Sequence, residues 1–199
     1  MQRTMMRLVF GVSTAVLLAA YGFAQEPSGS EIQKRKENQQ DRIANGVASG
    51  QLTAGETAKL EKQEAKLNKE IRKDRAANGG KLTDQEKTEV NRQQSLLSKE
   101  IYNEKHDSAA QHYGNNEVDR RRENQQDRIA NGIRSGQLTA GEAARLETQE
   151  SNINREVRSD RKANGGKLTN KQKAQVNRQL DRESNRIHDK KHNAARGPH

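Results

Sequence analysis

The chain has 199 residues and a formal net charge of +10, and charged residues make up 32% of it. It contains no cysteine, which excludes disulfide bonds, thiol catalysis and a lipid-modified cysteine anchor. Aromatic residues make up 3% of the chain and large apolar side chains are also scarce, which excludes a large globular core.

Residues 1–24 are predicted to be a secretory signal peptide. After an arginine-bearing start, Leu8 to Tyr21 form a mostly apolar run, and Gly22-Phe23-Ala24 place small residues before a cleavage site ahead of Gln25. The run is short for a membrane span, and an uncleaved anchor is the alternative. Cleavage after Ala24 would leave a periplasmic or secreted bacterial protein without a transmembrane segment.

The remainder of the chain is dominated by an internal duplication. Residues 35–106 (the first repeat) and 121–192 (the second repeat) align without a gap at an offset of 86, with 45 identities in 72 positions. Each repeat divides again, because the Leu-Thr pair of residues 52–53 recurs at residues 82–83. The chain is therefore expected to hold four helix-loop-helix sub-repeats. Outside the repeats we expect an N-terminal linker at 25–34, a linker at 107–120 and a disordered tail at 193–199.

The few apolar residues recur with the period of a helix. In the first repeat they predict helices near residues 31–45, 54–76 and 84–107. Because the loops between these helices are short, neighbouring helices should be antiparallel. We therefore predict an all-α fold, a tandem duplication of a three-helix unit around a thin apolar core. A long, partly frayed helical array is the structural alternative.

Helix ends are marked by two signals. A threonine followed three residues later by Glu or Gln is the capping-box pattern of a helix N-terminus, and it occurs at Thr53, Thr83, Thr139 and Thr169. Asn-Gly pairs, which tolerate the left-handed conformation, are expected to end helices at residues 45, 78, 131 and 164. The last helix is expected to pack less well, because Leu97 of the first repeat becomes Glu183 in the second.

The glycine, Leu-Thr and glutamate pattern resembles the second half of an EF-hand calcium loop, with Glu86 as the bidentate ligand. The three preceding ligand positions of that loop have no side-chain oxygen, however. In the fourth sub-repeat the glutamate is replaced by Gln172, which can complete a capping box but cannot supply a bidentate carboxylate. The pattern therefore favours capping over calcium. The candidate carboxylate ligands of a metal are Glu56, Glu86 and Glu142.

His188 and His192 form a second candidate metal site. They are four residues apart on a predicted helix, so both imidazoles could reach one transition metal. The first repeat has Tyr102 and His106 at these positions, so the pair is not shared between the repeats. A solvated, basic helix end is the favoured interpretation, and no cofactor is expected.

Enzymatic chemistry has little support in the sequence. The chain has no glycine-rich phosphate loop, no nucleophile elbow and no zinc-protease helix signature. Its carboxylates alternate with basic residues, as in Glu61-Lys62-Gln63-Glu64, and such mixing is typical of solvated helix faces. A deep, water-free pocket that shifts pKa values is not expected in so thin a core. We therefore expect no enzyme.

The basic balance of the chain points to anionic partners. Local basic clusters, such as residues 120–122 and 190–191, could bind lipopolysaccharide, an acidic cell-wall polymer or extracellular nucleic acid. Nucleic acid is the least expected of these, because export and the scarcity of aromatic residues argue against it. The alternative is that the charge only keeps an exported helical protein soluble.

The string Arg42-Ile-Ala-Asn-Gly-Val-Ala-Ser-Gly-Gln-Leu-Thr53, followed by a Leu-Glu-x-Gln-Glu helix, resembles uncharacterised exported bacterial helical-repeat proteins. The resemblance covers both repeats and implies an exported, all-helical fold, but it brings no catalytic residues. We therefore expect a non-enzymatic helical repeat protein of the cell envelope that acts by surface-mediated binding, or as a structural or stress-related component. Its partner would be an anionic envelope polymer or another envelope protein. An EF-hand-like metal binder is the alternative.

Overall fold

A computed structural model describes residues 29–197 of the chain, and it is all-helical, with six helices and no β-strand in that range. The helices are α1 (Gly29–Ala48), α2 (Ala54–Ala77), α3 (Asp84–Lys105), α4 (Glu117–Arg134), α5 (Ala140–Ala163) and α6 (Asn170–Lys191). The predicted all-α class is confirmed, and the observed bounds of the first three helices agree closely with the predicted ones. The predicted signal peptide lies outside the described residues. None of the described helices has the length and apolar character that crossing a membrane requires.

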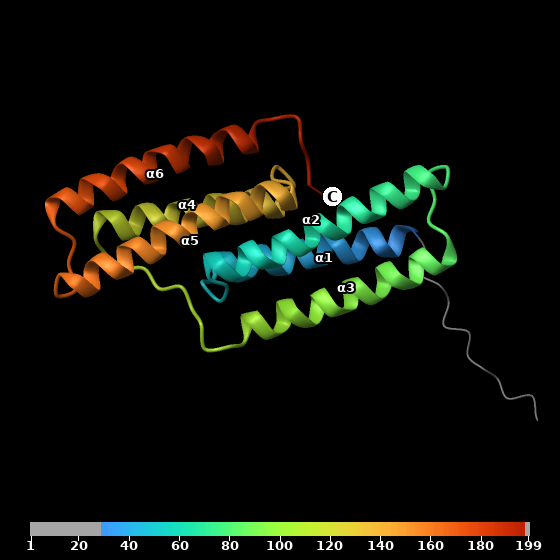
Figure 1. The fold of residues 1–199 in the computed structure, drawn as a ribbon, viewed down its shortest axis with the longest axis horizontal. Coiled ribbons are helices and arrows are strands. Elements are labelled where there is room, and N and C mark those ends of the chain that lie inside the picture. The colour runs from blue at the N-terminus through green and yellow to red at the C-terminus, as the bar shows by residue number, and fades with distance from the viewer. Residues whose placement is uncertain (1–28, 198–199) are drawn as a thin grey trace, which may run out of the picture.

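The helices form an elongated bundle whose two ends are joined at the centre (Figure 1). Helices α1, α2 and α3 pack together at one end, and α4, α5 and α6 at the other. At the centre α2 lies along α5, and α1 packs against α4. Small residues let α2 and α5 approach closely, since a Cβ atom on Gly55 would lie 3.4 Å from Ser151 Oγ and one on Gly141 would lie 3.9 Å from Ala65 Cβ. Gly55 therefore lies beside Ser151 and Gly141 beside Ala65, which shows that α2 and α5 are antiparallel.

The apolar core has three parts. The central cluster draws residues from all six helices, including Val47, Leu60, Ile133 and Leu146. One outer cluster joins Ile32 to residues of α2 and α3, and the other joins Val118 to residues of α5 and α6. The two ends of the bundle therefore share one core at the centre and have smaller cores of their own at the extremities.

The last helix is buried as much as its counterpart in the first repeat. Helix α6 buries four side chains, Val176, Leu180, Glu183 and Ile187, and α3 also buries four. The expected weaker packing of α6 therefore has no support in the burial of its side chains. Leu180 stands where the first repeat has Gln94, so the gain of an apolar residue one turn away compensates for Glu183.

All four predicted capping boxes are confirmed, at the N-termini of α2, α3, α5 and α6. Two of the four Asn-Gly predictions are wrong, because Asn45-Gly46 lies inside α1 and Asn131-Gly132 lies inside α4. A glycine at position 46 leaves room for the Leu52 side chain, because a Cβ atom on it would lie 2.6 Å from Leu52 Cδ1. The left-handed residue that follows α1 is Gly50, with φ of +71°.

The segments that follow α3 and α6 both return to glycine loops. The Gln111 amide donates to the Gly50 carbonyl at 2.8 Å, and the Gly197 amide donates to the Gly136 carbonyl at 2.8 Å. Gln111 and Gly197 are 86 positions apart, the offset of the repeats. Residues of the predicted linker and of the predicted disordered tail thus make the same backbone contact.

Candidate functional site

In the loops before α3 and α6, donors within the loop bond the side chain at the proposed metal-ligand position. The carboxylate of Glu86 accepts from the Thr83 amide at 2.8 Å and from Asn78 Nδ2 at 2.8 and 2.9 Å. Gln172 reproduces these bonds with its amide oxygen, which accepts from the Thr169 amide at 2.9 Å and from Asn164 Nδ2 at 3.0 Å. Since a neutral side chain makes the same bonds, the geometry of these loops supports capping.

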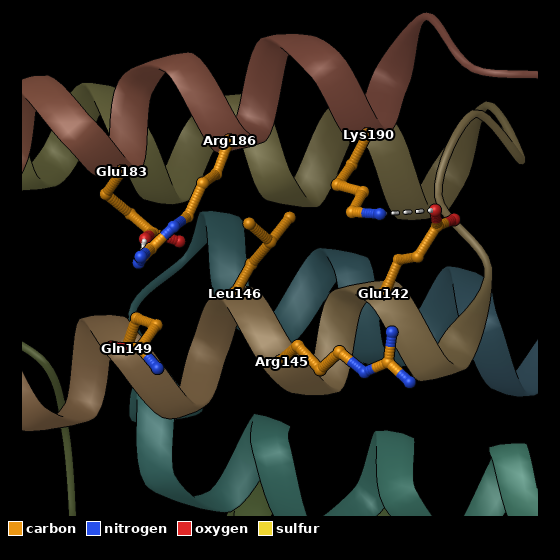
Figure 2. A pocket seen from close by; sticks show the side chains of 7 residues that line it. All are labelled: Glu142, Arg145, Leu146, Gln149, Glu183, Arg186 and Lys190. Atoms are coloured by element: carbon orange, nitrogen blue, oxygen red, sulfur yellow. Dashed lines mark hydrogen bonds and ion pairs between the residues drawn. The ribbon is translucent and has the colours of Figure 1, made fainter.

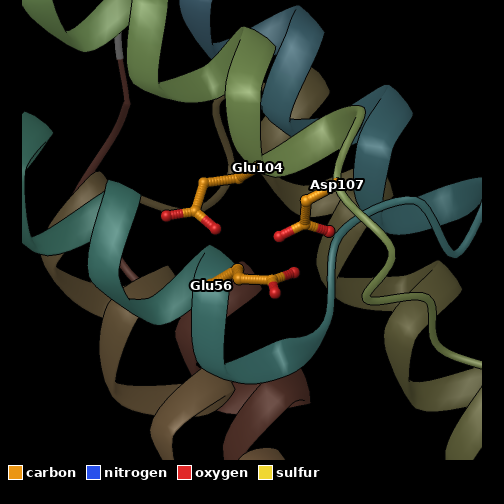
Figure 3. Close-up of side chains that lie close together, drawn as sticks. All are labelled: Glu56, Glu104 and Asp107. Atoms are coloured by element: carbon orange, nitrogen blue, oxygen red, sulfur yellow. The ribbon is translucent and has the colours of Figure 1, made fainter.

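Glu56 is the predicted metal residue that the structure brings together with other carboxylates. Its carboxylate oxygens, and those of Glu104 and Asp107, include atoms within 4.8 Å of one another (Figure 3). Burial, followed by the negative charges of Asp107 and Glu104, raises the pKa of Glu56, although hydrogen bonds from Thr53 oppose this. All three carboxylates already have donors: Glu56 accepts from the Thr53 amide at 2.8 Å, Glu104 accepts from Lys59 at 3.0 Å, and Asp107 accepts from the Ala109 amide at 2.8 Å.

Glu142, at the matching position of the second repeat, has different neighbours. Asn193 Nδ2 donates to it at 2.6 Å, and Lys190 Nζ lies 3.7 Å away, where the first repeat has Asp107 and Glu104. Burial acts to raise the pKa of Glu142, but hydrogen bonds from Asn193 and Thr139 outweigh burial and lower it. The two predicted ligands therefore lie in opposite electrostatic surroundings.

His188 and His192 stack on one another, with ring centroids 4.3 Å apart. His192 Nδ1 is 2.7 Å from the His188 carbonyl oxygen. Tyr102 and His106 stack in the same way in the first repeat, at 4.2 Å, although only one of them is an imidazole. The shared feature is therefore the stacked pair of rings at the helix end.

Three basic side chains, those of Arg145, Arg186 and Lys190, line a groove of about 320 Å³ between α5 and α6 (Figure 2). We call it the α5–α6 groove. Arg186 pairs with Glu183 at 3.1 Å, and Lys190 faces Glu142. Arg145 is exposed and forms no ion pair with any residue of the described part of the chain. The groove therefore has more positive than negative charge.

The equivalent surface of the first repeat carries acidic groups. The alignment pairs Arg145 with Lys59, Arg186 with Glu100 and Lys190 with Glu104. The Lys59 ammonium group bridges the two glutamates, at 2.7 Å from Glu100 and 3.0 Å from Glu104. A single lysine between two carboxylates thus occupies the place where the second repeat presents three basic groups.

The largest departure from the sequence-based expectation is inside the bundle, where glutamates are buried. Glu61, Glu64, Glu147 and Glu150 each have 0% of their surface exposed. The prediction that Glu61-Lys62-Gln63-Glu64 forms a solvated face is therefore wrong for both glutamates. Their oxygens are poorly satisfied: both carboxylate oxygens of Glu64 and both of Glu150 lack a hydrogen-bond partner within the described residues.

Burial shifts the titration of these glutamates, since removal from water disfavours the charged form. It raises the pKa of Glu64 to about 7 against the opposing charge of Lys36, and it raises the pKa of Glu150 to about 8. The pKa values of Glu61 and Glu147 are raised well above the ordinary value, again mainly by burial. The packing of helices in this thin core is therefore sufficient to raise the pKa values of carboxyl groups.

Two of the four buried glutamates, Glu61 and Glu147, accept hydrogen bonds from glutamines of α1 and α4. Gln40 Nε2 donates to Glu61 at 3.2 Å, and Gln126 Nε2 donates to Glu147 at 3.0 Å. Each glutamate receives this donor on one oxygen, while its other oxygen has no partner in the described residues. A protonated carboxyl group has a donor of its own, so protonation reduces the excess of acceptors in this layer.

Charge is segregated between the interior and the surface. Among residues 29–197, seven acidic side chains are buried but only one basic side chain, that of Arg122. The predicted basic cluster at residues 120–122 is thereby split, because Arg122 donates to Asp119 at 2.9 Å and to Asn154 at 2.8 Å. The outer surface is therefore more positive than the composition of the chain indicates.

One signal in the sequence could have identified the buried glutamates. Glu61 and Glu64 are retained in the second repeat as Glu147 and Glu150, whereas the exposed Lys62 between them becomes threonine. Positions 57, 61, 64 and 68 also recur with a helical period, beside the apolar stripe. Retention of acidic residues on such a face indicates burial.

Comparison with protein-family models, curated proteins and solved structures finds no match for this chain. The arrangement of its charged side chains is therefore the basis on which its function can be inferred. Two features stand out: buried carboxyl groups whose pKa values are raised, and basic groups that face solvent.

Proposed function

We propose that this protein is a non-enzymatic, exported bacterial protein of the cell envelope that binds anionic polymers through its basic outer surface. Its scaffold would be a tandem duplication of a three-helix unit with four helix-loop-helix sub-repeats. The long helices, of 18 to 24 residues, and the shared central core suit a rigid carrier of surface charge, and nothing in the proposal requires a bound cofactor.

The observation that carries this proposal is the segregation of charge. Glutamates that would otherwise neutralise surface lysines and arginines lie inside the bundle, and their raised pKa values favour the neutral form. Each glutamate that becomes neutral makes the molecule more positive. A positive outer surface attracts polyanions and raises their rate of association.

A binding titration with an acidic polysaccharide tests the proposal. We expect the full chain to bind fluorescein-labelled alginate in low salt and to lose affinity steeply as salt is added, because exposed charges are screened. Neutral dextran of the same length is the control and should not bind. Equal binding to alginate and dextran, or an affinity for alginate that salt does not change, would refute the proposal.

A further inference from the structure

We propose that the α5–α6 groove is the specific docking site for an acidic glycan, recognised by the basic side chains of Arg145, Arg186 and Lys190. This inference rests on the proposed function, since it names where the anionic polymer binds and which chemical class of polymer it is. It does not require the rest of the basic surface to be inert.

The two repeats differ by a reversal of charge at very few positions. Among the 72 aligned positions, only two exchange a residue of one charge for a residue of the opposite charge. They are Glu100, which becomes Arg186, and Glu104, which becomes Lys190. Both residues of the second repeat line the α5–α6 groove, one helical turn apart on α6. The reversals are thus concentrated in one place on the molecule.

The first repeat displays the interaction that the groove lacks. There Lys59 is held by two carboxylates, those of Glu100 and Glu104, at 2.7 and 3.0 Å. Arg145 has the position of Lys59 but has neither carboxylate partner, because both have been replaced by basic residues. Carboxylates supplied by a ligand would restore to Arg145 the partners that Lys59 has within its own repeat.

Two basic side chains of the groove are accessible to solvent. The side chains of Arg186 and Lys190 are 54% and 42% exposed, so both can reach a ligand in solvent. Their acidic partners are much less accessible, since Glu183 is 1% exposed and the Glu142 side chain is 9% exposed. The positive ends of these pairs are therefore more accessible to solvent than the negative ends.

The remaining lining favours a glycan over nucleic acid. The groove is lined by Leu146 and Gln149 in addition to its charged groups, and none of the described residues that line it is aromatic. Single-stranded nucleic acid usually binds by stacking its bases on aromatic side chains, for which this groove provides no platform. Leu146 is buried in the central cluster and only forms the floor of the groove, whereas Gln149 is exposed and suits hydrogen bonding to the hydroxyl groups of a uronic-acid polymer.

The test compares two triple variants in the alginate titration. The groove variant is Arg145→Gln with Arg186→Gln and Lys190→Gln, and the control is Lys62→Gln with Lys66→Gln and Lys69→Gln, three exposed lysines of α2. Both lose the same formal charge, so general attraction falls equally. We expect the groove variant to bind at least about tenfold more weakly than wild type and the control to stay within about threefold.

A reciprocal variant tests whether the two charge reversals are sufficient to create a binding site in the first repeat. Glu100→Arg with Glu104→Lys gives the first repeat the charges of the second, and we expect the number of alginate oligomers bound per chain to double. Equal losses in the groove and control variants, with alginate binding by wild type, would overturn the groove site but leave the proposed function standing. Failure of the wild-type chain to bind alginate would overturn both.

Discussion

Glu61 of α2 and Glu147 of α5 are both fully buried, and burial raises the pKa of Glu147, with smaller contributions from the charges of Glu150 and, across the contact between the two helices, Glu61. The two residues occupy the same position of the two repeats. Burying a charged carboxylate costs several kcal/mol, so a bundle that contains both is most stable when at least one of them is protonated. Proton binding and packing at the centre of the molecule are therefore coupled.

The stability of the fold should decrease as the pH rises from 5 to 8. Carboxyl groups with raised pKa values bind protons more tightly in the folded than in the unfolded chain, where the glutamate pKa is about 4.3. Their contribution is complete below that value and is lost as the pH passes the folded pKa, about 7 for Glu64 and about 8 for Glu150.

Groups that face these two glutamates modulate the effect without reversing it. Lys36 opposes the shift at Glu64, whereas Arg122 opposes and Glu183 reinforces the shift at Glu150. We expect the melting temperature, followed by far-UV circular dichroism, to fall by at least about 10 °C between pH 5 and pH 8. A melting temperature that is constant or rises over this range would contradict the raised pKa values.

Replacing the two central glutamates by glutamine should remove part of this pH dependence. Glu61→Gln with Glu147→Gln keeps the size of the side chains and cannot ionise, so we expect about 1–3 kcal/mol more stability at pH 8 and little change at pH 5. Asp41→Asn with Asp127→Asn, an exposed pair at matching positions, is the control and should leave the pH profile of wild type unchanged. Denaturant melts at both pH values measure the difference.

Gly46 and Gly132 should not tolerate alanine. A Cβ atom on Gly46 would lie 2.6 Å from Leu52 Cδ1, and one on Gly132 would lie 2.7 Å from Leu138 Cδ1. Both leucines are fully buried. Alanine favours a helix by about 1 kcal/mol over glycine, but overpacking costs about 1–3 kcal/mol, so we expect net destabilisation. Combining Gly46→Ala with Leu52→Val should recover part of the loss. A more stable Gly46→Ala variant would show that the contact can relax.

Local signals predicted the helices because their physical basis is local. Each capping box needs only the threonine and the residue three positions later, and all four were found in place. The ends of α1 and α4 were misplaced for a non-local reason. A glycine tolerates the left-handed conformation, but it is also small. At Gly46 it is the small size that matters, because Leu52 packs against it.

The buried glutamates were missed because their surroundings come from distant helices. Within α2, Glu61 and Glu64 alternate with lysines as exposed residues do, and only the packing of α1 and α5 against α2 encloses them. The α5–α6 groove was missed for a related reason. Arg145 is 41 positions before Arg186 in the chain, so their shared groove depends on how α6 folds back on α5.

The EF-hand hypothesis remains testable through calcium. Because Gln172 makes the same bonds as Glu86, we expect Glu86→Gln to change stability by less than about 0.5 kcal/mol, and 1 mM calcium to leave the melting temperature of wild type unchanged. The contrary result would be a calcium-dependent rise in melting temperature that is lost in the Glu56→Gln variant and kept in the Glu142→Gln variant. It would make Glu56, Glu104 and Asp107 a metal site.

The most direct test of charge segregation is to count the protons exchanged on folding. Refolding the full chain from denaturant at pH 7 in weakly buffered solution, with the pH recorded, measures the difference in bound protons between the two states. If the glutamates are neutral inside the bundle, the chain should take up about three protons as it folds. Release of protons, or no exchange, would mean that these carboxyl groups stay ionised and that the surface has no additional positive charge.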